Sequence, residues 1–263
     1  MKNKEQIIIQ QKEFIKKMEN ATVKFIDSID KSQIETILLS GSVARGDFFP
    51  EKKENGEYEG MIDLIVMKKD GSSITAEKLF GKNQDPEIPY HCIKVEGIWF
   101  QILFTDFITC QKFAIFEEPR KFSVLESKIL YDSNNKYKNE LAKINKYKIE
   151  ECKRKLEEKK GYIYYLISDY KTSRWLRRDA FLQLHENLNT AIRESIYCLY
   201  YLNNSYAPAE DRMVYYSLSL KKVPKNYESF LLELKNQTTD SLENYKLREE
   251  LFKTNVLSFL EKN

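Results

Sequence analysis

The chain has 263 residues, and its 43 lysine and arginine residues against 40 aspartate and glutamate residues give a formal net charge of +3. Such a balance is untypical of a dedicated polyanion binder, so we do not expect nucleic acid as a partner. Hydrophobic residues make up 42% and aromatic residues 13%, which is enough apolar material for one large or two modest cores and excludes wholesale disorder.

The distribution of apolar and metal-binding residues predicts a cytoplasmic protein without a membrane or zinc partner. No apolar run approaches the ~20 residues that a membrane-spanning helix needs, and charges interrupt the N-terminal residues throughout, unlike a signal peptide. The four cysteines form no CxxC pair and there are only two histidines, which argues against a zinc site built from Cys and His.

The first half of the chain predicts mixed helix and strand. Apolar residues at helical intervals over residues 3–29 predict an amphipathic helix. Short runs rich in β-branched and aromatic residues then predict strands. These strands cover residues 34–40, 61–67, 90–95 and 98–104. Glu96-Gly97 is a two-residue connection of the kind that closes a β-hairpin.

The composition changes near residue 133, where we place a domain boundary. From Lys136 the chain has almost no Gly or Pro until Pro208, and apolar residues at heptad-like spacing from Asp179 to Asn204 predict a core helix. We read the Lys/Glu-rich stretch at 136–160 as a solvated helix face. The predicted fold class is α+β, with a mixed sheet and flanking helices in residues 1–132 and an all-helical bundle in residues 133–263.

One segment carries chemistry. Ser40-Gly41-Ser42 follows directly on a strand, and its small residues would let the backbone approach an anion closely. Arg45-Gly46-Asp47 completes this turn, in which Arg45 is a candidate either to clamp a phosphate or to pair with Asp47. A later apolar strand carries Asp63, whose charge among apolar neighbours suggests a functional role.

These residues together resemble the nucleotidyltransferase superfamily with a DNA polymerase β-like palm, and among its members the antibiotic-modifying and minimal nucleotidyltransferases look closest. The resemblance covers roughly residues 34–132, and residues 128–132 look like the closing strand of the family. It implies that Gly41, Ser42 and Arg45 bind the phosphates of a nucleoside triphosphate (NTP) and that Asp63 binds Mg²⁺. It also implies a helical substrate-binding domain, in which Glu186 or Glu194 would take the proton from a hydroxyl of a small-molecule acceptor.

The sequence departs from the family pattern at the metal ligands. The family carries two aspartates one residue apart and a third carboxylate on a later strand, whereas aligning Asp63 with the second aspartate places Met61 and Gln101 at the other two positions. Neither side chain replaces a carboxylate as a ligand for Mg²⁺. Glu59, Glu57 or Asp47 could supply a substitute oxygen, and we select Glu59 as the second candidate metal ligand.

Two main hypotheses follow, and they differ on whether the protein is an enzyme. In the first, the protein transfers a nucleoside monophosphate from an NTP to a hydroxyl of a small molecule, with Mg²⁺ as cofactor. In the second, it is a catalytically degenerate nucleotide-binding or protein-interaction module, as Met61 and Gln101 suggest. A third alternative, RNA binding through the Lys-rich helix, is disfavoured by the near-zero net charge.

Overall fold

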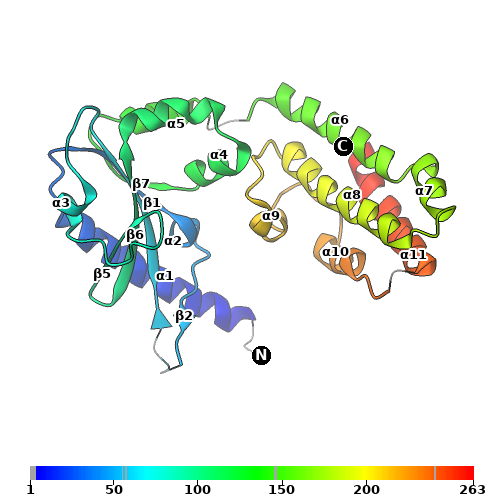
Figure 1. Cartoon of the computed structure of the whole chain (residues 1–263), viewed down its shortest axis with the longest axis horizontal. Helices are drawn as coiled ribbons and strands as arrows, with labels where there is room; N and C mark the ends of the chain where they lie inside the picture. Colours follow the sequence, from blue (N-terminus) through cyan, green and yellow to red (C-terminus); the bar gives the residue numbers. More distant parts are fainter. Residues whose placement is uncertain (1–3, 55, 57, 145–146, 240) are drawn as a thin grey trace. The chain divides into compact units, whose positions relative to one another are not determined.

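A computed structural model describes residues 4–54, 56, 58–144, 147–239 and 241–263 of the chain (Figure 1). It divides into two compact units, Met1–Asn145 and Lys146–Asn263. The first is an α+β unit with a mixed sheet, and the second consists of helices, so the predicted fold class is confirmed. No helix in the described ranges has the length and apolarity needed to cross a bilayer.

The first unit contains a five-stranded sheet in the order β5-β6-β4-β1-β7. Its strands are β1 (Ile34–Ser40), β4 (Met61–Lys68), β5 (His91–Val95), β6 (Ile98–Asp106) and β7 (Lys128–Asp132). β4 and β6 run parallel, and the other three pairings are antiparallel. β2 (Glu51–Lys52) and β3 (Tyr58–Glu59) form a separate small antiparallel sheet within the long charged loop.

The predicted hairpin between β5 and β6 is confirmed. Val95 pairs with Ile98, and the two connecting residues, Glu96 and Gly97, have φ of 48° and 80°. Positive φ at both central residues is the geometry of a type I′ turn, whose twist matches that of the two strands it joins.

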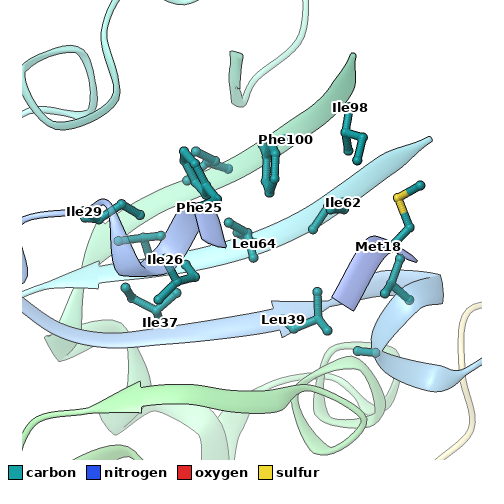
Figure 2. Close-up of a cluster of buried hydrophobic side chains, with 14 of the residues drawn as sticks. Met18, Phe25, Ile26, Ile29, Ile37, Leu39, Ile62, Leu64, Ile98 and Phe100 are labelled. Atoms are coloured by element: carbon teal, nitrogen blue, oxygen red, sulfur yellow. The ribbon is translucent and has the colours of Figure 1, made fainter. Parts of the chain in front are cut away.

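One face of the sheet packs against the long helix α1 (Lys4–Asp27). Figure 2 shows Met18, Phe25 and Ile26 of this helix pointing toward strand residues such as Leu64 and Phe100. Alternate residues of a strand point to the same face, so the even-numbered β4 residues Ile62, Leu64 and Val66 enter this core. Asp63 therefore belongs to the opposite face.

The opposite face is partly covered by three short helices: the 3₁₀-helix η1 (Phe107–Ile115), α4 (Glu118–Leu125) and α5 (Lys136–Ala142). Tyr137 and Ile144 join the buried cluster on this face. This packing attaches the chain beyond β7 to the first unit, which is why the unit extends to Asn145 rather than ending at the predicted boundary after residue 132. Two five-residue helices, α2 (Gly41–Arg45) and α3 (Ala76–Phe80), complete the unit.

The second unit is helical throughout its described residues, apart from its connecting loops. Its α-helices are α6 (Ile149–Leu166), α7 (Asp169–Leu176), α8 (Phe181–Leu202), α9 (Glu210–Ser217), α10 (Tyr227–Lys235), α11 (Leu242–Phe252) and α12 (Ser258–Lys262). A π-helical turn, η2 (Lys253–Leu257), joins α11 to α12. The central helix α8, predicted from its apolar spacing, buries more than half of its residues, including Leu188 and Leu199.

Candidate functional site

The turn that follows β1 closes on itself through its backbone. Gly41 has a φ of 66° and begins α2, and Gly46, with a φ of 83°, ends it. The backbone N–H groups of Gly46 and Asp47 both donate to the carbonyl oxygen of Ser42, at 3.1 and 3.0 Å. Both glycines adopt the left-handed conformation that other residues enter only at a cost, so the turn depends on them.

Asp63 lies directly against this turn. Ser40 and Asp63 are paired across β1 and β4, so the carboxylate of Asp63 reaches the start of the turn. A Cβ atom placed on Gly41 would lie 1.9 Å from Oδ2 of Asp63, which is far inside any real contact. The absence of a side chain at Gly41 thus makes room for the carboxylate. The structure brings together Gly41 and Asp63, two site residues predicted from the sequence.

The positions next to Asp63 carry no further carboxylate. On the parallel neighbour β6, Gln101 is paired with Asp63 and Trp99 is paired with Met61. Met61 and Asp63 are two residues apart on one strand and so point to the same face. The register thus places a thioether and a neutral amide around Asp63. Magnesium prefers charged oxygen ligands to either of these groups.

Glu59, our second candidate metal ligand, is engaged by two cations and an indole. Its Oε1 accepts from Nζ of Lys94 at 2.8 Å and from Nε1 of Trp99 at 2.9 Å, and its Oε2 pairs with Nζ of Lys53 at 2.7 Å. The hydrogen bonds from Lys53 and Lys94 lower the pKa of Glu59 to about 2. Glu59 is therefore a firmly ionised carboxylate, and binding a metal would require it to exchange these partners.

Arg45 and Asp47 form an ion pair within the turn itself. Nε of Arg45 lies 3.5 Å from Oδ2 of Asp47, and the side chain of Arg45 is only 8% exposed. Of the two roles considered for Arg45, the structure shows the pairing with Asp47. Across the part of the chain that the structure describes, no three His, Cys, Asp or Glu side chains form a ready metal cluster. Glu57, the remaining substitute ligand considered, lies outside the described residues.

A cavity of about 370 Å³ opens beside these residues, at the edge where β4 and β6 begin. Met61, Trp99 and Gln101 contribute to its wall, and so do the acidic residues Glu51, Glu59 and Asp85. Its apolar walls come from the loops: Phe48, Phe49, Pro50 and Ile88. This volume lies in the range of small-molecule sites, which are usually apolar with a few polar groups.

This cavity was not predicted from the sequence. The one feature that pointed to it is the apolar triplet Phe48-Phe49-Pro50 in an otherwise charged loop. Because β2 and β3 pair within the loop, this segment returns to the start of β4, where Gly60 and Met61 line the same cavity. Strands of only two residues are too short to show an alternating pattern in the sequence.

The two candidate base residues, Glu186 and Glu194, both lie on α8 in the second unit. Glu194 is buried, with 8% of its surface exposed, and forms an ion pair with Lys159 of α6. Glu186 is exposed, and its Oε1 accepts a hydrogen bond from Nδ2 of Asn189 at 3.3 Å. Of the two, Glu186 is the carboxylate that solvent and small molecules reach.

Comparison with known proteins does not identify a family for this chain. No family model and no curated protein matches the chain. Among solved structures, a nucleotidyltransferase-like protein from Exiguobacterium sibiricum 255-15 is similar over 97% of this chain and 75% of its own, with 9% sequence identity and a TM-score of 0.39. A likeness of this size does not establish family membership, so a function has to be inferred from the residues of this chain.

Proposed function

We propose that the first unit binds a nucleoside triphosphate, with the phosphates at the Ser40–Asp47 turn and the base in the cavity beside Met61 and Gln101. The observation that carries this proposal is the contact of the Asp63 carboxylate with Gly41. A carboxylate, which is a group that Mg²⁺ prefers, therefore lies at a turn of small residues, next to a cavity of suitable size for an aromatic base. The sequence resemblance to nucleotidyltransferases supports the same assignment.

The proposal includes one magnesium ion rather than two. Asp63 and the phosphate oxygens are the ligands that would hold it, and bound there it would neutralise phosphate charge. A second ion would need carboxylates at the positions of Met61 and Gln101, which the register places around Asp63. Because two-metal chemistry depends on closely placed oxygens, we propose binding of the nucleotide without rapid transfer.

Nucleotide-dependent thermal stabilisation of the full chain tests this proposal. A ligand present at 100 times its Kd adds about 2.7 kcal/mol of stability, which raises the melting temperature by several degrees. We expect such a rise with at least one of ATP, GTP, CTP or UTP, and a larger rise with Mg²⁺ present. Asp63→Asn should abolish the Mg²⁺-dependent part. Asp27→Asn, which removes an exposed carboxylate at the end of α1, is the charge-matched control and should behave as wild type.

The fluorescence of Trp99 provides an independent readout of the cavity. The chain has two tryptophans, and Trp175→Phe leaves Trp99 as the single indole emitter. We expect NTP binding to change its emission, because Trp99 lines the cavity. Absence of any nucleotide effect on both melting temperature and Trp99 emission would overturn the proposal.

Transfer itself is decided by a separate assay. Metal-dependent release of pyrophosphate in the presence of hydroxyl-bearing acceptors would show that the chain is an active nucleotidyltransferase, as the resemblance implies. We expect no release above the rate of Asp63→Asn, because the neighbouring positions carry Met61 and Gln101.

A further inference from the structure

The second unit contains its own cavity, of about 470 Å³, between α8, α9 and α10. One part of its wall is apolar and consists of Ile192, Ile196, Met213 and Val214. The remainder is polar and consists of Asn189, Arg193, Glu210, Lys235 and Gln237. A wall that divides in this way suits a ligand with an apolar body and a polar head.

Behind two of these polar residues lies a buried arginine. Arg248 of α11 is 1% exposed. Its Nε donates to the carbonyl oxygen of Leu234 at 2.7 Å, and its terminal nitrogens donate to the side-chain oxygens of Asn189 and Gln237. The fourth acceptor is Nδ1 of His185, at 2.8 Å. All four acceptors are neutral, so no carboxylate in direct hydrogen-bond contact compensates the buried charge.

This arrangement fixes the polarity of the cavity wall. Arginine has only donors, so the amides of Asn189 and Gln237 must turn their oxygens toward Arg248. The two N–H groups of Asn189 are engaged in turn, since its Nδ2 donates to Oε1 of Gln237 at 3.2 Å and to Oε1 of Glu186 at 3.3 Å. The ring of His185 must likewise accept at Nδ1 and carry its proton on Nε2, 3.1 Å from the carbonyl oxygen of Ser241.

Two more cations reach the cavity from its rim. Arg193 of α8 and Lys235 of α10 are exposed, and within the described ranges neither side chain forms a hydrogen bond or an ion pair. Glu210 is the single carboxylate in the wall. The carboxylate of Glu186 lies next to Asn189 and offsets the charge of Arg248, so the positive potential of the cavity comes from Arg193 and Lys235 against Glu210.

We infer that this cavity binds an organic anion, with a carboxylate or phosphate head at Arg193 and Lys235. Its apolar body would lie on Ile192, Ile196, Met213 and Val214. Guanidinium and ammonium groups both donate to such heads, and charge-assisted hydrogen bonds are the stronger kind. The inference depends on residues of the second unit alone and stands independently of nucleotide binding at Asp63.

The test compares probes that share an apolar chain and differ in the head. Hexanoate, hexyl phosphate, hexanol and hexylammonium are titrated into the full chain by calorimetry at low ionic strength. We expect one or both anions to bind and to weaken as salt is added, and hexanol and hexylammonium to bind at least about tenfold more weakly. The stronger of the two anions identifies the head. Binding of neither anion, or equal binding of hexylammonium, would overturn the inference.

Matched variants locate the site. Arg193→Gln combined with Lys235→Gln removes the two rim cations, which are exposed and contribute nothing to the core. We expect this double variant to weaken the anion by about tenfold or more. Lys225→Gln combined with Lys246→Gln removes the same charge from exposed positions outside the cavity wall and should leave the affinity unchanged. Equal affinity in both double variants would contradict the assignment.

Discussion

At the scale of single residues, the close approach of Asp63 to Gly41 predicts that a side chain at position 41 destabilises the protein. Gly41→Ala adds a methyl group at a positive φ and into the space of Oδ2 of Asp63, so it should destabilise the protein by about 2–3 kcal/mol in urea unfolding. Gly46→Ala is the control, because its φ is also positive but nothing lies within 4 Å of the added atom. It should cost only about 1–2 kcal/mol.

A double variant separates the contact from the backbone strain. In Asp63→Ala the carboxylate is gone and only Cβ, 3.0 Å from the added methyl group, remains, so Gly41→Ala should cost less in this background than in the wild type. A Gly41→Ala cost that persists undiminished in the Asp63→Ala background would show that the turn and the carboxylate are not in contact.

Glu59 predicts a particular pH dependence. Its folded pKa is about 2, against an ordinary value of 4.5, because Lys53 and Lys94 donate to the ionised form. The stabilisation is therefore fully present above about pH 4.5 and is lost as the pH falls toward 2. Unfolding free energies of wild type and Glu59→Gln should differ near neutral pH and converge in acid.

The matched control for this pH series is Glu54→Gln, an exposed glutamate of the same charged loop. Its stability difference from wild type should be small and should not follow the acid convergence of Glu59→Gln. If the gap between wild type and Glu59→Gln instead widened on acidification, the ion pairs of Glu59 would not be the cause.

At the scale of elements, Arg248 joins three helices of the second unit. From α11 it donates to His185 and Asn189 of α8, to Leu234 at the end of α10, and to Gln237 just beyond it. Arg248→Met would leave these buried acceptors without their donor and should cost about 3 kcal/mol or more. Arg248→Lys should recover only part of this loss, since a lysine ammonium cannot reproduce the planar set of N–H donors of the guanidinium group. Chemical denaturation followed by far-UV circular dichroism measures both.

Some of these helices and strands could be predicted from the sequence, and others could not. The first four long strands and the hairpin at Glu96-Gly97 follow from local β-rich runs and turn chemistry, and β1, β4 and β5 match their predicted ranges to within a residue. The helical stretch predicted from Lys136 is instead not helical at residues 143–144 and 147–148, where Ile144 and Tyr147 are buried. Tertiary packing overrides local helical propensity there.

The contacts at the candidate sites also differ in whether they could be predicted from the sequence. Gly41 and Asp63 could be placed together because a turn residue and a charged strand residue are visible in the sequence. The partners of Glu59 and Arg248 could not, because these pairs depend on register and on helix packing between residues far apart in the chain. Neither cavity corresponds to a contiguous motif.

At the scale of the whole molecule, each unit has its own buried core. Sheet residues such as Leu64 and Phe100 fill that of the first unit, and Tyr200, Tyr245 and Phe252 are among the largest buried side chains of the second. Both units also have the size of ordinary domains. We expect residues 1–145 and 146–263 to fold when expressed separately, each with a cooperative thermal transition.

Ligand binding by the separate units extends this prediction. The fragment 1–145 should retain the nucleotide response and the fragment 146–263 the anion response, because all residues assigned to each site belong to one unit. A fragment that keeps its helical circular dichroism but melts without a cooperative transition would show that its core needs the other unit.

The pairing of Asp63 with Gln101 also makes this edge of the sheet open to redesign. Met61 is 44% exposed and Gln101 is half-buried, so an acidic side chain at either position would reach solvent rather than enter the core. Met61→Asp combined with Gln101→Glu would therefore place three carboxylates close together without a change in strand register. Side-chain replacement alone would supply the oxygen ligands that a two-metal site needs.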